Sequence, residues 1–155
     1  MGAFIFGLDS DTPDMLRRRA SYVIRSGVDV MQTTYLTPLP GTRLFDRFRK
    51  ENRLRYGDFP KDWEHYDMTE VLFRPKGMEP NRLVEIMRTL NQQMYSWPVI
   101  LYKAMSTLFQ TRDPVATVFA FYSNMNYGGV WRGKSMVRQL RGDEEFLIDI
   151  IVVIL

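Results

Sequence analysis

Cysteine is absent from this chain of 155 residues, and histidine occurs once. Without a thiol, the chain can form no disulfide and can offer no thiolate ligand to an iron–sulfur cluster. The single histidine, His65, has carboxylates near it in the sequence but no second histidine at ligand spacing, which favours a loop contact over metal ligation. The lack of cysteine agrees with a reducing compartment, so we expect a cytoplasmic location.

The sequence also lacks a large excess of charge and an apolar run long enough to span a membrane. Its 21 Lys and Arg residues nearly balance 18 Asp and Glu residues, so we expect no nucleic-acid partner. The only long apolar run, residues 146–155, holds ten residues, whereas a membrane span needs about 20. We therefore expect no transmembrane segment, and interpret this run as a buried strand or an aggregation-prone end. Because Met1 leads directly into a predicted strand, we expect no signal peptide.

Two short stretches carry most of the structural information. AFIFGLDSDTP (3–13) and VDVMQTTYLTPLPGT (28–42) flank one amphipathic helical pattern whose predicted buried stripe is Leu16, Ala20 and Val23. They predict a strand, a turn, a helix, a second strand and a proline-braced loop. Connections of this kind are right-handed between parallel strands, so both strands should end on one face, where α/β folds bind ligands.

At these residues the chain resembles the radical S-adenosylmethionine enzymes, within them the cobalamin-binding subgroup. FIFGLDSDTPDM is similar to that subgroup's fifth barrel strand and turn, and TYLTPLPGTRLFDRF to its sixth strand, proline loop and last helix. DWEHYDMTEVLFRPKGMEPNRL, residues 62–83, resembles the segment that leaves the barrel. The chain departs from the family in lacking the CxxxCxxC loop that holds the 4Fe-4S cluster.

The resemblance implies an α/β fold: the last two βα units of a partial (β/α)6 TIM-like barrel, followed by an α-helical region. It implies the distal fragment of an enzyme for radical-mediated methyl transfer or oxidative rearrangement. S-adenosylmethionine would be the cofactor, with a 4Fe-4S cluster and cobalamin only in the full-length protein. The partner would be the missing N-terminal part of the same enzyme. Alone, the chain should be inactive, since it lacks the cluster cysteines.

The expected cofactor site lies at the two strand ends, where apolar contacts and backbone hydrogen bonds would line the adenosine side. Its expected residues are Phe6, Gly7, Leu8, Asp9, Thr37, Pro38, Leu39 and Pro40. No catalytic residue and no metal ligand is assigned. A carboxylate at a strand end can accept hydrogen bonds from a ribose or an amine, or it can cap the next helix. The cap is favoured for Asp11, whereas both interpretations stay open for Asp9.

The rest of the chain divides into a connecting arm and a helical region. We expect residues 1–52 to form the end of the barrel, 53–79 the arm and 80–155 a helical domain, with a break or kink at Pro98. A third helix begins at Asp113-Pro114, and its apolar residues are expected to face inward; they are Val115, Val118, Phe119, Tyr122 and Met125. The many methionines and aromatic residues favour core packing, with an apolar small-molecule substrate as the alternative.

Two other functional classes remain open. One is a different nucleotide-binding α/β domain, which an upstream phosphate-binding glycine motif would support. The other is a non-catalytic helical interaction module that carries a βα remnant.

Overall fold

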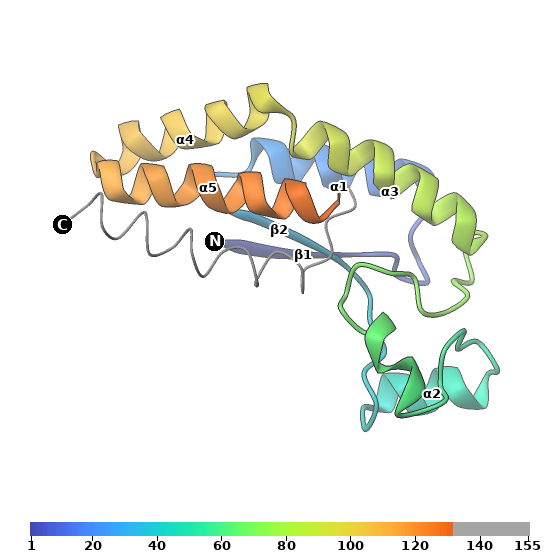
Figure 1. Ribbon diagram of the computed structural model, residues 1–155. Coiled ribbons are helices and arrows are strands. Elements are labelled where there is room, and N and C mark those ends of the chain that lie inside the picture. Colours follow the sequence, from blue (N-terminus) through green and yellow to red (C-terminus); the bar gives the residue numbers. More distant parts are fainter. Residues whose placement is uncertain (132–155) are drawn as a thin grey trace.

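The computed structural model describes residues 1–131, which form a small sheet with helices packed on it (Figure 1). In chain order the elements are β1 (Gly2–Phe6), α1 (Pro13–Arg25), β2 (Met31–Tyr35), α2 (Arg43–Lys50), the 3₁₀-helix η1 (Lys61–His65), α3 (Pro80–Met94), α4 (Trp97–Thr111) and α5 (Pro114–Val130).

The strand–helix–strand unit at the start of the chain is confirmed. Strands β1 and β2 pair in parallel, in a register that joins Gly2 to Met31 and Phe6 to Tyr35. Helix α1 begins after Thr12, whose side chain accepts a hydrogen bond from the Met15 amide. Its buried residues are the predicted stripe Leu16, Ala20 and Val23. The two strands therefore end on the same side.

Helices cover one face of this sheet. Alternate residues of β2, namely Met31, Thr33 and Tyr35, are buried, because the side chains of a strand point to opposite faces in turn. Helix α5 packs on β2, and α3 packs against α1. On the other face, Ile5 is half exposed, and the described residues leave Gln32 and Thr34 only partly covered.

The expected partial TIM-like barrel is wrong for the part of the chain that the structure describes. Residues 1–131 contain a two-stranded sheet and five α-helices. A second barrel unit would lay the helix after β2 against the sheet. Instead α2 lies apart from the sheet (Figure 1), and its Phe45 packs in a separate small cluster with Tyr66 and Leu72. The result is a small α/β fold in which α1, α3 and α5 provide the cover.

The helical region breaks near Pro98, as predicted. Helix α3 ends at Met94, and Pro98 lies in the first turn of α4, where a proline is tolerated. Asp113 caps α5 by accepting hydrogen bonds from the amides of Val115 and Ala116. Within residues 1–131 no helix is long and apolar enough to cross a membrane. The apolar run 146–155, and with it the end of the expected helical domain 80–155, lies outside the described residues.

The inward face expected for α5 is wrong. Its buried residues are Ala120, Asn124 and Gly128, whereas Val115 and Phe119 are 59% and 63% exposed. Small residues let a helix approach a strand closely, so the side that faces β2 is the small and polar one. The apolar side of α5 is left exposed, as are apolar residues of α4 such as Phe109.

Candidate binding site at the strand ends

The turn after β1 is held by a buried carboxylate. Asp11 is 1% exposed, and its Oδ2 accepts hydrogen bonds from the amides of Gly7 (3.0 Å) and Leu8 (2.9 Å). Arg19 completes the arrangement with two bonds to the same carboxylate, Nη2 to Oδ1 at 2.7 Å and Nη1 to Oδ2 at 2.9 Å. Asp11 therefore fixes the turn, while Thr12 caps the helix in its place.

Gly7 has a structural reason to be glycine. Its φ is +86°, a backbone conformation that residues with a Cβ rarely adopt. A Cβ built at this position would also lie 2.9 Å from Cδ2 of Leu83 on α3. The expectation that Gly7 serves the approach of a ligand therefore has a competing explanation, because the fold alone requires it.

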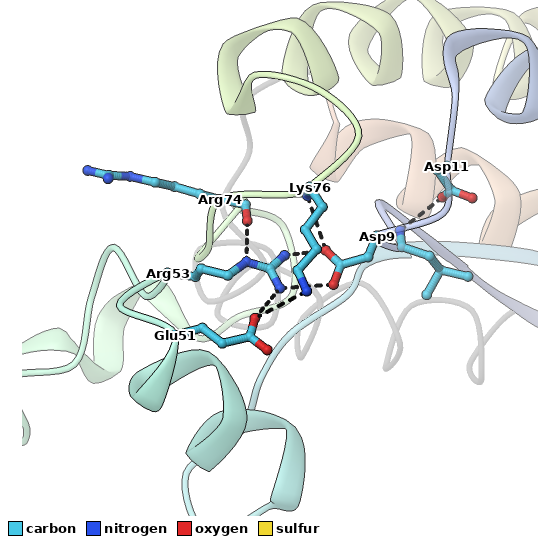
Figure 2. A network of polar contacts seen from close by, with 7 residues as sticks. Asp9, Asp11, Glu51, Arg53, Arg74 and Lys76 are labelled. Carbon is cyan, nitrogen blue, oxygen red and sulfur yellow. Dashed lines mark hydrogen bonds and ion pairs between the residues drawn. The ribbon is translucent and has the colours of Figure 1, made fainter.

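Asp9 forms an ion pair with Arg53 of the arm. From the sequence, only a ligand contact or a helix cap is expected for this carboxylate. Arg53 Nη1 donates to Asp9 Oδ2 at 2.9 Å and Arg53 Nη2 donates to Oδ1, so the pair is bidentate (Figure 2). The Lys76 amide donates to Asp9 Oδ1 at 3.2 Å. Arg53 also donates to Glu51 (2.8 Å) and, through Nε, to the Arg74 carbonyl (2.8 Å). These contacts of Asp9, Arg53 and Glu51, here called the clasp, join the end of β1 to the arm.

The environment of the clasp shifts the pKa values of its members. The hydrogen bond from Arg53 holds the pKa of Asp9 below its ordinary value of 3.8, against the opposing effect of burial. The same guanidinium lowers the pKa of Glu51, and the two carboxylates raise the pKa of Arg53. All three groups are charged at neutral pH. The Arg53 guanidinium lies over the Phe48 ring, 4.3 Å from its centroid, so the charge sits among aromatic rings.

The loop after β2 is more open. The Thr37 hydroxyl donates to the Tyr35 carbonyl at 3.2 Å, and the Leu39 carbonyl accepts from the amide and the hydroxyl of Thr42. Pro38 is buried, and Pro40 is half-buried. Leu39 is 38% exposed, and a Cβ at Gly41 would meet nothing within 4 Å. Space and apolar surface are therefore available at this loop.

The structure brings the two expected loops together, but they differ in how many backbone amides are free to donate a hydrogen bond. The Leu36 amide donates to the Phe6 carbonyl at 2.8 Å, which joins the strands at their ends. Phe6 itself is fully buried, and the amides of Gly7 and Leu8 are used by Asp11. Among the residues expected for the site, the remaining amide donors are those of Asp9, Thr37 and Leu39, which make no hydrogen bond within residues 1–131.

The contribution of the arm could not be found from the sequence. Arg53 is separated from Asp9 by 44 residues, and nothing in the local pattern around it distinguishes it from the exposed arginines nearby. His65 lies on the arm too, stacked on Tyr56 with ring centroids 3.9 Å apart and with Nδ1 at 3.1 Å from Glu70. Within the described residues, no three His, Cys, Asp or Glu side chains gather as a metal site would require.

Comparison with known proteins finds two similar methyltransferases. The chain is 28% identical over 100 residues to a bacteriochlorophyllide d C-12(1)-methyltransferase of Chlorobaculum tepidum, a match that covers 64% of the chain and 21% of that protein. It is 24% identical over 103 residues to an uncharacterized methyltransferase of Pyrococcus horikoshii, covering 66% of the chain and 22% of that protein. The chain thus spans about a fifth of the length of the curated relatives it matches.

No family model matches the chain, and no solved structure matches it. These findings correct the assignment to the radical S-adenosylmethionine enzymes. Both relatives are described as methyltransferases, and neither description names a radical reaction, an iron–sulfur cluster or cobalamin. What the comparisons show is similarity to two methyltransferases over about two thirds of the chain.

Proposed function

We propose that this chain is part of an S-adenosylmethionine-dependent methyltransferase and that its strand-end loops contact the methyl donor. The observation that carries the proposal is the similarity to two methyltransferases over about two thirds of the chain. The parallel pairing of β1 and β2 supports the placement, because ligands of α/β folds bind beyond the carboxyl ends of the strands.

The residues of the chain would position and shield the donor. At the loop after β2, the amides of Thr37 and Leu39 are available as hydrogen-bond donors, and the exposed side chain of Leu39 offers apolar contact. On the β1 side, Asp11 and Arg53 already engage the amides of Gly7 and Leu8 and the Asp9 carboxylate, so this turn would contribute its shape and the Asp9 amide. The donor supplies an electrophilic methyl group, and these residues orient it and exclude water.

The remaining parts of the proposal concern the whole protein. Residues 1–52 would supply the strand-end loops, 53–79 the arm that clasps them and 80–155 the helical region. Further chain of the same enzyme would complete the site, as the relatives are about five times longer than the matched segment. The methyl acceptor would be a small molecule, and the location cytoplasmic. The acceptor named for the Chlorobaculum protein is bacteriochlorophyllide d, a substrate of that protein.

Amide-resolved NMR titration of the 155-residue chain tests the placement of the donor. S-adenosylmethionine, taken to millimolar concentrations, should shift the amide signals of Thr37, Leu39 and Gly41 more than those of α4. ATP should not reproduce the pattern. Leu39→Ala should weaken the binding at least about threefold, a loss of roughly 0.7 kcal/mol. Leu101→Ala, at a comparably exposed leucine of α4, should leave it unchanged.

Two results would overturn the proposal. One is the absence of any shift at the loop after β2. The other is an equal response to ATP and to S-adenosylmethionine, which would point to general nucleotide binding.

A further inference from the structure

A cavity of about 300 Å³ opens between β2, the arm and the end of α5. It is separate from the loops at the strand ends, and none of the residues expected for the cofactor site lines it. Its volume is at the lower end of the range for small-molecule sites. The lining residues that bear on its chemistry are Gln32, Thr34, Tyr66, Met68, Tyr127 and Trp131.

Aromatic rings form much of its wall, and they are fixed in place. Trp131 meets Tyr35 edge to face, with centroids 5.3 Å apart and an interplanar angle of 77°. The Tyr66 hydroxyl donates to the Tyr56 carbonyl at 2.9 Å, which holds the ring with its polar end turned to the arm. Tyr127 packs against the main core. Rigid rings of this kind suit a flat apolar partner, because stacking requires no reorganisation of the site.

The strand provides the polar groups of the cavity. Gln32 and Thr34 point to the same side of β2, and their side chains make no hydrogen bond within residues 1–131. Thr33, between them, points to the opposite side and is bonded to Asn91 and Tyr95. These two side chains are therefore the candidates among the lining residues of β2 to bond to a substituent of a ligand.

The backbone at Met68 is strained where it borders the cavity. Its φ is +68°, a value that is unusual for a long side chain. The Met68 carbonyl accepts the Tyr35 amide at 3.0 Å, and the Asp67 carboxylate accepts the amide and hydroxyl of Thr69, which together hold this conformation. Strain of this kind is retained where the surrounding structure fixes it, and it clusters at ligand sites.

We propose that this cavity is a binding site for a planar, largely apolar ring compound that carries a hydrogen-bonding substituent. The ring would lie against Trp131 and the flexible thioether of Met68, while Gln32 and Thr34 bond to the substituent. A two-ring aromatic compound suits the volume, and a larger ring system would insert one edge. The proposal rests on this chain's own residues and holds whether or not S-adenosylmethionine binds at the strand ends.

Two probes with the same carbon skeleton and hydroxyl group test the requirement for planarity. 2-Naphthol is flat, whereas decahydro-2-naphthol is saturated and puckered. Titrated into the 155-residue chain carrying a carbon-13 label on its methionine methyl groups, 2-naphthol should shift the Met68 signal and bind at least tenfold more tightly than the saturated alcohol.

Variants locate the binding. Trp131→Ala should weaken 2-naphthol binding at least tenfold and Thr34→Val about threefold. Phe109→Ala should leave it unchanged, because this exposed aromatic residue of α4 lies outside the cavity. Thr34→Val also guards against misfolding as an explanation, since it replaces a half-buried side chain by one of the same shape.

Equal affinity for the two alcohols would overturn the proposal. So would an unmoved Met68 signal, or a loss in Phe109→Ala as large as that in Trp131→Ala, which would indicate adsorption to exposed apolar surface. The S-adenosylmethionine titration reads different amides, so failure of one site is distinguishable from failure of the other.

Discussion

Asn124 of α5 accepts a hydrogen bond from the Met31 amide at 2.9 Å, through Oδ1. Its Nδ2 donates to the Asp29 carbonyl at 2.7 Å and to the Ala120 carbonyl at 2.8 Å. A fully buried side chain thus satisfies the backbone of the residues that open β2, more than 90 residues away in the chain. The amide fixes where α5 lies on the strand, and with it the position of the cavity wall at Tyr127 and Trp131.

Replacement of Asn124 should destabilise the fold. Asn124→Leu keeps the branching and the number of heavy atoms of the side chain but leaves the Met31 amide and the Asp29 carbonyl without partners, at a cost of about 1–3 kcal/mol in the free energy of unfolding. Urea denaturation followed by circular dichroism would measure it. Asn81→Leu, at an exposed position of α3, is the control. Equal stability of the two variants would show that α5 is not held by this residue.

A series of glycine substitutions should separate backbone strain from crowding. Gly27→Ala meets nothing within 4 Å and should change the free energy of unfolding by no more than about 1 kcal/mol. Gly41→Ala has open space but a φ of +82°, and should cost about 1–2 kcal/mol. Gly7→Ala combines a positive φ with the contact to Leu83, and should cost about 2–5 kcal/mol.

A double-mutant cycle tests whether the contact with Leu83 contributes to the cost of Gly7→Ala. Leu83→Val removes the Cδ2 atom that a Cβ at position 7 would meet. Gly7→Ala and Leu83→Val together should therefore cost less than the sum of the two single changes. Additive costs would mean that the backbone conformation alone requires the glycine.

Because of the Asp9–Arg53 pair, the free energy of unfolding should fall at low pH. Because the folded state lowers the pKa of Asp9 below 3.8, its contribution is complete at about pH 5 and above, and it is lost as the pH falls through 3.8 toward the folded-state value. Asp9→Asn should lower the free energy of unfolding at pH 7 by about 1–3 kcal/mol, since Arg53 is left mostly buried with only Glu51 as an ionic partner.

The variant should also lose less stability than the parent chain between pH 6 and pH 3, a range of about three units around the ordinary carboxyl pKa. Asp14→Asn breaks an exposed pair with Arg17 and should cost about 0.5 kcal/mol or less. Denaturation curves at several pH values would measure both effects. Identical pH profiles for the parent and Asp9→Asn would contradict the assignment of the clasp.

The outer sides of α4 and α5 should promote self-association. Phe109 and Phe119 are 76% and 63% exposed, in a region with few charged side chains. Phe109→Glu with Phe119→Glu should reduce the concentration dependence of the apparent mass in light scattering and leave stability nearly unchanged. Gln110→Glu, an exposed neighbour on α4, controls for the added charge. Unchanged association would locate the contact elsewhere.

The buried face of a helix can be predicted from the sequence where its apolar residues recur with the period of the helix. Leu16, Ala20 and Val23 repeat with the period of a helix, and α1 buries them. The same logic fails for α5, because Asn124 turns a polar side chain inward to bond to β2 and the apolar stripe faces out. Hydrophobic periodicity cannot anticipate a helix whose packing depends on a side-chain amide.

The candidate sites were accessible from the sequence to different degrees. The two strand ends could be placed side by side, because parallel pairing follows from the order of the elements. The clasp at Asp9 and the cavity at Gln32 and Thr34 depend on how the arm folds back over the sheet, and its irregular backbone has no periodic signal. The sequence marks Gly7 as a glycine at a strand end, but it does not reveal the close neighbour Leu83, which comes from α3.

The contact between Gly7 and Leu83 has a consequence for how this protein can evolve. Position 7 tolerates a side chain only if position 83 gives up the atom that occupies the space and the turn after β1 changes its backbone conformation. The two positions are therefore not free to drift independently. Among descendants of this sequence, a larger residue at position 7 should be accompanied by a shorter one at position 83.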